Sequence, residues 1–175
     1  MKLGKLTFSP INEHTELLAP TTAERAQDLS DSIWVTPIDA TLADTAAFCE
    51  AYDVGLDISA NCVVVEAKRG DRVWYAACII LATDKVDVNG TVRKHLDARK
   101  LSFAPMDTAV ALTGMEYGGI TPVGLPDEWP ILIDSAVMTH EKVIIGSGIR
   151  ASKILIESSA LAKLPSATVL DIKKA

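Results

Sequence analysis

The sequence predicts an α+β fold in a single domain with a mixed β-sheet. The chain has 175 residues, which suits one domain with a sizeable core. Hydrophobic residues make up 49% and aromatic residues 5%, so aliphatic side chains must fill that core. Strand-like and helix-like segments follow one another without the strict strand–helix–strand rhythm of a parallel α/β protein, which favours a mixed sheet.

The first third of the chain predicts short elements. Residues 1–30 are expected to form an N-terminal extension, and residues 31–175 the main domain. Thr41, with Asp44 three residues later, is expected to cap a helix that Gly55 stops. The expected elements are a strand at 5–8, a helix at 22–29, a strand at 33–35 and a helix at 42–52.

The middle of the chain predicts a β-hairpin. Residues 63–65 and 74–81 are expected to be strands, and Arg69-Gly70-Asp71 between them has the chemistry of a tight turn. The second strand is apolar on both faces, so it should be central in its sheet. The later elements expected are a helix at 88–96, a helix at 107–111 ended by Gly114, strands at 130–134 and 142–145, a helix at 151–162 and a strand at 167–171.

Charge and composition limit the partners. The net charge is −6, and the first 60 residues carry 3 basic and 10 acidic side chains. Because gripping duplex DNA requires a basic face, duplex DNA is not an expected partner. The low aromatic content also disfavours a stacking platform for single-stranded nucleic acid, although one end of a nucleic acid could enter a local pocket.

A cytoplasmic protein without a membrane segment or a metal site is expected. No apolar stretch reaches the ~18 residues of a membrane span, and the N-terminus turns polar at once. The three cysteines are expected to be small buried hydrophobes, and the three histidines lack metal spacing. One basic cluster either lines a solvated helix face or contacts a few phosphates: Arg93, Lys94, Arg99 and Lys100.

Two glycine-rich stretches are the places where chemistry is expected. Residues 113–124 hold four of the ten glycines, whose N–H groups could hold a carboxylate, a phosphate or an oxyanion. Residues 146–151 follow an expected strand and open an expected helix, a setting that binds anions. This second stretch fits the pattern G-x-G-x-x-A, but too few residues follow it for a dinucleotide fold. Ordinary turns remain the alternative for both stretches.

The run from about Ala60 to Asp171 resembles the YbaK/EbsC family, also called the prolyl-tRNA synthetase-associated editing domain family. The residues that carry the resemblance are the hairpin at 62–81, the Gly-Gly-Ile-Thr-Pro-Val-Gly turn at 118–124, the strand that ends at Asp134 and the turn at 146–150. The resemblance implies a mixed, barrel-like sheet surrounded by helices.

The resemblance also implies an activity. It implies a freestanding domain that hydrolyses the ester of a mischarged aminoacyl-tRNA, with water or a substrate group as the attacking nucleophile. No cofactor is implied. The implied partners are the 3′ end of an aminoacyl-tRNA and, optionally, an aminoacyl-tRNA synthetase. Known members remove cysteine or alanine from the proline tRNA.

The resemblance places the site in the two glycine turns and the first hairpin strand. The amides of Gly118 and Gly119 are expected to polarise the ester carbonyl. The residues expected to be catalytic are Asn61, Gly118, Gly119 and Lys153. The residues expected to bind substrate are Glu116, Tyr117, Thr121, Gly146, Ser147, Gly148 and Arg150.

Two positions depart from the family pattern. Active members carry a lysine where this chain has Asn61, and an aspartate where it has Lys153. One hypothesis is that Lys153 supplies, from the expected helix, the charge missing at Asn61; the alternative is a solvated lysine. Because Asn61 carries no charge, a catalytically silent module that binds a tRNA 3′ end, a nucleoside or an amino acid is the second interpretation. A third is an interaction protein that uses its acidic first 60 residues.

Overall fold

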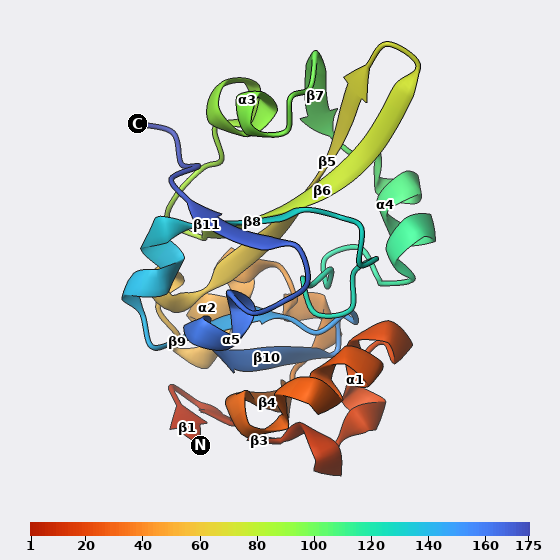
Figure 1. Ribbon diagram of the computed structural model, residues 1–175. Coiled ribbons are helices and arrows are strands. Elements are labelled where there is room, and N and C mark those ends of the chain that lie inside the picture. The colour runs from red at the N-terminus through yellow and green to blue at the C-terminus, as the bar shows by residue number, and fades with distance from the viewer.

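Two β-sheets form the framework of the protein in the computed structural model, which describes residues 1–175 (Figure 1). A five-stranded sheet has the order β11-β8-β6-β5-β7, and a four-stranded sheet has the order β3-β4-β10-β9. The strands of the first are β5 (Ala60–Arg69), β6 (Arg72–Leu81), β7 (Lys100–Phe103), β8 (Ile131–Asp134) and β11 (Ala167–Leu170). Those of the second are β3 (Ser9–Pro10), β4 (Ile33–Pro37), β9 (Lys142–Gly146) and β10 (Ser152–Glu157).

The five-stranded sheet is mixed, as the sequence predicts. β5 pairs antiparallel with β6 and β7, whereas β8 pairs parallel with β6 and β11. β6 lies at the centre of this sheet, which confirms the expectation from its apolar faces. The β5–β6 hairpin turns at Gly70, whose φ of 59° glycine adopts without strain. The hairpin projects past the rest of the molecule (Figure 1).

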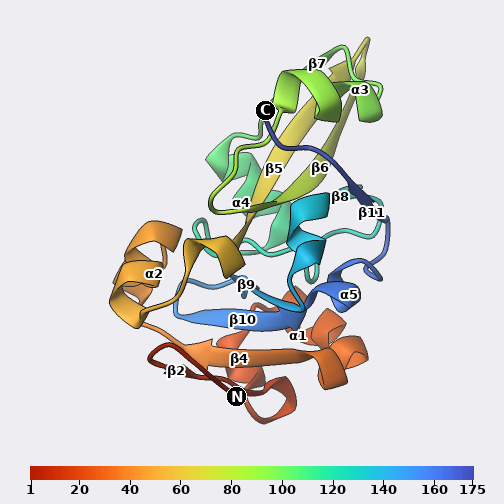
Figure 2. The same cartoon turned by 90° about the vertical axis from the view of Figure 1, so that its left-hand side faces the viewer.

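The helices are short and surround the sheets (Figure 2). They are α1 (Pro20–Ala26), α2 (Thr45–Tyr52), α3 (Arg93–His95), α4 (Met106–Thr113) and α5 (Ser158–Leu161). The expected cap at Thr41 is wrong: the N–H of Thr41 donates instead to Asp39 Oδ1 at 2.9 Å, and α2 begins only at Thr45. No helix is long and apolar enough to cross a membrane.

The largest core cluster contains buried residues from both sheets. Aliphatic residues of β5 and β6 meet those of β9 and β10 in this cluster, consistent with the low aromatic content. The first residues of the chain also contribute buried side chains, among them Leu6, Phe8 and Ile11. β3 pairs with β4, and a two-stranded hairpin of β1 (Lys2–Leu3) and β2 (Leu6–Thr7) lies beside them.

The sheets do not close into a barrel, so the barrel-like description is corrected. Each sheet keeps two edge strands, and β7 and β11 are the edges of the five-stranded one. The sheets pack against each other across the large core, and an isolated bridge between Ser59 and Ile144 joins them at one point.

The helix expected at 151–162 is wrong. Residues Ser152–Glu157 form β10, and only Ser158–Leu161 are helical. β10 lies between β4 and β9, and Lys153 to Ile156 are all buried. A short apolar run buried on both faces is typical of a central strand. The turn at 146–150 therefore joins two antiparallel strands, and the helix N-terminus expected there does not exist.

Candidate active site

A cavity of about 350 Å³ brings together most of the segments that the sequence singles out. It lies where the N-terminus of α2, the start of β5, the loop after α4 and the facing ends of β9 and β10 meet. Five expected site residues line it, from four separate segments. They are Asn61, Tyr117, Gly118, Gly146 and Lys153.

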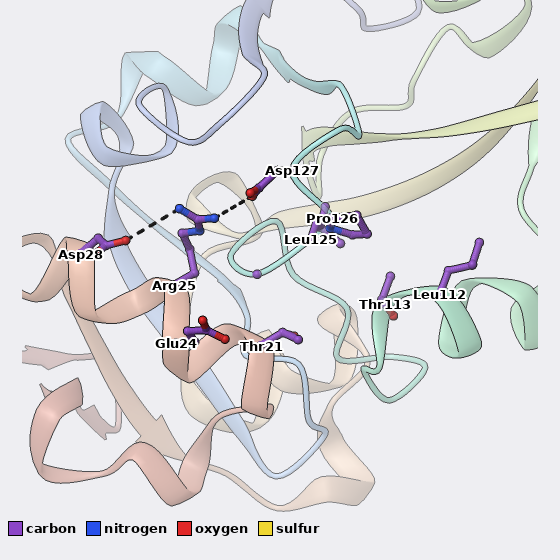
Figure 3. A pocket seen from close by; sticks show the side chains of 10 residues that line it. Thr21, Glu24, Arg25, Asp28, Leu112, Thr113, Leu125, Pro126 and Asp127 are labelled. Atoms are coloured by element: carbon purple, nitrogen blue, oxygen red, sulfur yellow. Dashed lines mark hydrogen bonds and ion pairs between the residues drawn. The ribbon is translucent and has the colours of Figure 1, made fainter.

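A larger cavity, of about 410 Å³, lies elsewhere, between α1, α4 and the loop at 124–127 (Figure 3). Arg25 lines this cavity and already forms ion pairs, with Asp127 at 2.6 Å and with Asp28 at 3.7 Å. None of the expected site residues lines this cavity. The smaller cavity is therefore the candidate site.

Asn61 lies on β5, where the strand extends beyond the end of β7. Its Oδ1 accepts a hydrogen bond of 2.6 Å from Thr45 Oγ1 at the start of α2. Its amide NH₂ donates to no group of the protein. Asn61 thus offers a free, neutral donor at the wall of the cavity.

Lys153 is a buried cation without an acidic partner. Its register on β10 is opposite Gly146 and Thr36, and the residue is 7% exposed. Nζ donates to the carbonyl of Ala43 at 2.9 Å and lies 5.2 Å from the centre of the Phe48 ring. No carboxylate lies within 4 Å of it. Burial lowers the pKa of Lys153 from 10.5 to about 8, so it remains mostly charged at neutral pH.

The Gly118–Gly119 turn contributes one free N–H group. Gly118 has a φ of 87°, in the left-handed region that favours glycine, and its N–H has no acceptor in the protein. The N–H of Gly119 donates to the carbonyl of Glu116 at 3.0 Å, so the turn itself uses that group. A Cβ on Gly119 would lie 2.6 Å from the carbonyl oxygen of Ile149, which explains why glycine is needed here.

Arg150 and Glu116 hold the two glycine turns together. The N–H of Arg150 donates to Glu116 Oε1 at 2.8 Å, and its Nη1 donates to the carbonyl of Tyr117 at 3.3 Å. Arg150 Nη1 also lies 3.8 Å from Asp44 Oδ1. Neither Arg150 nor Glu116 lines the cavity.

The remaining expected residues do not line the cavity. Ser147 is fully buried, and its Oγ donates to the carbonyls of Ile149 and Ser152 at 3.0 and 3.1 Å. Thr121 is also fully buried, and its Oγ1 accepts from the N–H of Val123 at 3.5 Å. The N–H of Gly148 donates to the carbonyl of Gly119 at 2.7 Å. These bonds fix the shape of both turns.

Sequence reasoning missed the N-terminus of α2. Ala43, Asp44 and Thr45 line the cavity, and Asp44 is its only carboxylate. The sequence predicts that this helix begins at residue 42, which would place Asp44 inside its first turn and give no reason to expect it at a cavity. In the structure, α2 begins at Thr45. Asp44 is in fact the N-cap residue, and its side chain makes no capping bond.

One cysteine lines the cavity, and burial keeps its thiol protonated. This cysteine is Cys62: burial raises the pKa of its thiol, and burial raises the pKa of Cys78 to about 12. A thiol held in its protonated form is a poor nucleophile. No group of three or more His, Cys, Asp or Glu side chains is placed to hold a metal ion.

The family model described as the aminoacyl-tRNA editing domain matches residues 39–164, most of the chain and all of the cavity. The chain therefore belongs to the aminoacyl-tRNA editing domain family.

Solved structures share this fold. A candidate trans-editing enzyme for prolyl tRNA synthetase matches with a TM-score of 0.74 and 18% identity, over 90% of this chain and 99% of that one. The hypothetical protein APE2540 matches with a TM-score of 0.77 and 18% identity, over 88% and 99%. A candidate signal transduction protein from Marinobacter aquaeolei VT8 matches with a TM-score of 0.57 and 16% identity, over 89% of this chain but 31% of its own length.

Proposed function

We propose that this chain hydrolyses the ester that joins a wrong amino acid to the 3′ end of a tRNA, and that the reaction takes place in the cavity lined by Asn61, Gly118 and Lys153. One observation carries the proposal. Within the residues that match the editing family, three separate segments place a free amide NH₂, a free backbone N–H and an unpaired ammonium group around one cavity. Donors of this kind suit a reaction that develops an oxyanion.

In the proposed reaction, water hydrolyses the ester, and no cofactor takes part. The oxygen of a water molecule adds to the ester carbonyl carbon and gives a tetrahedral oxyanion. The bond between that carbon and the ribose oxygen then breaks. One proton of the water ends on the ribose oxygen, and the products are a free amino acid and a tRNA with its terminal hydroxyl restored. Each donor that reaches the oxyanion contributes about 3 kcal/mol of transition-state stabilisation.

Lys153 supplies the positive charge in this proposal. The resemblance places the family lysine at Asn61 and the family aspartate at Lys153. Because both residues line the same cavity, β10 supplies the positive charge that β5 supplies in the family pattern. The expected helix is not needed for this exchange, since Lys153 reaches the cavity from a strand.

Asp44 is proposed to bind the ammonium group of the amino acid. It is the only carboxylate that lines the cavity, and its side chain is mostly exposed at the rim. Glu116, expected from the sequence to bind substrate, instead accepts a hydrogen bond from the backbone of Arg150. Changing Asp44 to Asn should therefore raise KM more than it lowers kcat, as measured with an aminoacyl-tRNA that proves to be a substrate.

The direct test is deacylation of a panel of mischarged tRNAs that includes alanine and cysteine on the proline tRNA. The similar candidate trans-editing enzyme supports that choice. Gly118→Val should abolish release of the amino acid. Gly70→Val is the matched control, since Gly70 also has positive φ but lies at the hairpin tip with open space around it. Release from no member of the panel by the folded protein would contradict the proposal.

The second candidate is a silent binding module, and the loss of the family lysine at Asn61 favours it. Such a module would bind a tRNA end or an amino acid saturably without turnover. Further proposals are that the protein acts in the cytoplasm and works beside an aminoacyl-tRNA synthetase. Residues 31–175 would form the editing domain, with residues 1–30 supporting β4.

A further inference from the structure

The two most exposed large apolar side chains of the protein are both aromatic, and both lie near the candidate site. Phe103 is 66% exposed and Tyr117 is 57% exposed. Tyr117 lines the cavity. Phe103 is opposite Val65 in the β5–β7 register, two strand residues beyond Val63, which lines the cavity. Two strand residues span about 7 Å, which separates the register position of Phe103 from that of Val63 along β5.

Beyond Phe103, the same strands carry unpaired positive charge. Lys100 at the start of β7 is opposite Lys68, and Arg69 is opposite Arg72. Like charges in directly opposite positions destabilise a sheet. Two of these four charges are offset by ion pairs. Lys68 pairs with Glu66 at 3.3 Å, and Arg69 pairs with Asp97 at 3.4 Å.

Three further cations at this end of the sheet have no acidic partner. Arg72, Arg99 and Lys100 have no carboxylate within 4 Å, and all three are exposed. Arg72 instead lies over the ring of Trp74, at 4.3 Å from its centre. In a chain with a net charge of −6, this is a local excess of positive charge that the fold does not neutralise.

This end of the molecule is open to a partner. β7 is an edge strand, so no further strand covers its outer side. The β5–β6 hairpin, β7 and α3 lie together at one end of the protein, and β4 and α1 lie at the other (Figures 1 and 2). A negatively charged partner would therefore be attracted to the unneutralised cations at the hairpin end.

We propose that Arg99, just before β7, and Lys100 and Phe103, which project from opposite faces of that edge strand, form a track along the open edge of the sheet that binds the unpaired nucleotides leading to the cavity, so that the partner is the single-stranded 3′ end of an RNA. This proposal rests on the proposed function. Aromatic side chains stack on unpaired bases, and exposed cations bind the phosphates between them. From Val63 to Lys68, which faces Lys100, five strand residues span about 17 Å, long enough for several nucleotides. The composition disfavours a broad stacking platform, but the two exposed aromatic side chains are concentrated at one place.

The test is binding of a fluorescein-labelled, eight-nucleotide RNA that ends in CCA, measured by anisotropy over a series of salt concentrations. Phe103→Ala should weaken binding about tenfold at fixed salt, because one base loses its stacking partner. Arg99→Ala and Lys100→Ala should each lower the slope of log K against log salt by about 0.7. Val169→Ala, on the opposite edge strand β11, and Lys163→Ala are the matched controls and should change nothing.

Failure of the track and failure of the proposed function can be distinguished. The variants are also tested for hydrolysis of a mischarged tRNA and of the same amino acid esterified to adenosine alone. The track variants should slow the first reaction and leave the second unchanged. If the wild-type protein does not bind the RNA, or if all three variants bind it as the wild type does, the track does not exist, even where both esters are hydrolysed. If neither ester is hydrolysed while the variants still weaken RNA binding, the proposed function fails and the track stands.

Discussion

Lys153 stands out among individual residues because the fold would be more stable without its charge. A lysine that is 7% exposed and has no carboxylate within 4 Å loses hydration without recovering it in an ion pair. The lowered pKa of Lys153 reflects the same cost of burying its charge. Residues kept at a cost to stability are typical of functional sites. The resemblance to the editing family drew attention to Lys153, but sequence alone could not place its side chain against Asn61, 92 residues earlier, in a common cavity.

Replacing this charge should separate stability from activity. Lys153→Met keeps the length of the side chain and removes the buried cation, so the free energy of unfolding at pH 7 should rise by about 1–3 kcal/mol. Urea denaturation measures this change. Deacylation by the same variant should fall at least 100-fold. A variant that is less stable than the wild type would show that the hydrogen bond to Ala43 and the contact with Phe48 outweigh the cost of burying the charge, and would contradict this prediction.

The lowered pKa of Lys153 predicts how stability and deacylation depend on pH. The pKa of Lys153 is about 8 when folded and 10.5 in its ordinary state, so the unfolded chain binds more protons between these values. Stability of the wild type should therefore rise with pH from about 8 to 10.5, and Lys153→Met should lack this rise. Deacylation, corrected for the spontaneous rate, should fall as pH rises through about 8, because the cation is lost. A rate that instead increases through pH 8 would make Lys153 a general base.

The elements that the sequence predicts well are those with local signals. The β5–β6 hairpin has its turn residues and apolar runs side by side in the chain, and both strands form where expected. β10 has no such signal, since Ala151-Ser152-Lys153 resembles a helix start and the Ile-Leu-Ile run suits a buried helix or a buried strand equally. The choice between them depends on β4 and β9, which flank β10 from distant parts of the chain.

The glycine turns show the same dependence on distant contacts, and Gly119 offers a test. A Cβ there meets the backbone of Ile149, which cannot move without disturbing the turn before β10. Gly119→Ala should therefore lower the free energy of unfolding by about 2–4 kcal/mol. Gly70→Ala, with positive φ and open space, should cost about 1–2 kcal/mol. Thermal unfolding of the two variants compares them, and equal costs would mean that the two turns are not packed as described.

For the molecule as a whole, the first thirty residues belong to the folded unit. Leu6, Phe8 and Ile11 are buried, β3 extends the four-stranded sheet, and the N–H of Ala19 donates to the carbonyl of Ser147 in the second glycine turn. Their largely polar sequence suggests an extension when read alone. Their few apolar side chains nevertheless complete the core around α2 and β10.

A chain that lacks residues 1–19 should lose cooperative unfolding at room temperature, because several core side chains and the support of the Ser147 turn disappear together. Near-ultraviolet circular dichroism and thermal unfolding measure this. A truncated chain that melts within a few degrees of the complete one would show that the segment is an appendage, independent of the core.

The most direct test of the account is the deacylation rate of four proteins on one mischarged tRNA: the wild type, Lys153→Ala, Asn61→Lys, and the double variant. If the cavity needs one cation and accepts it from either strand, Lys153→Ala should lose at least 100-fold in kcat/KM. The double variant, which restores the family lysine on β5, should recover most of that loss. Lys153→Ala with a wild-type rate, or a folded double variant that stays inactive, would contradict the claim that Lys153 takes the place of that lysine.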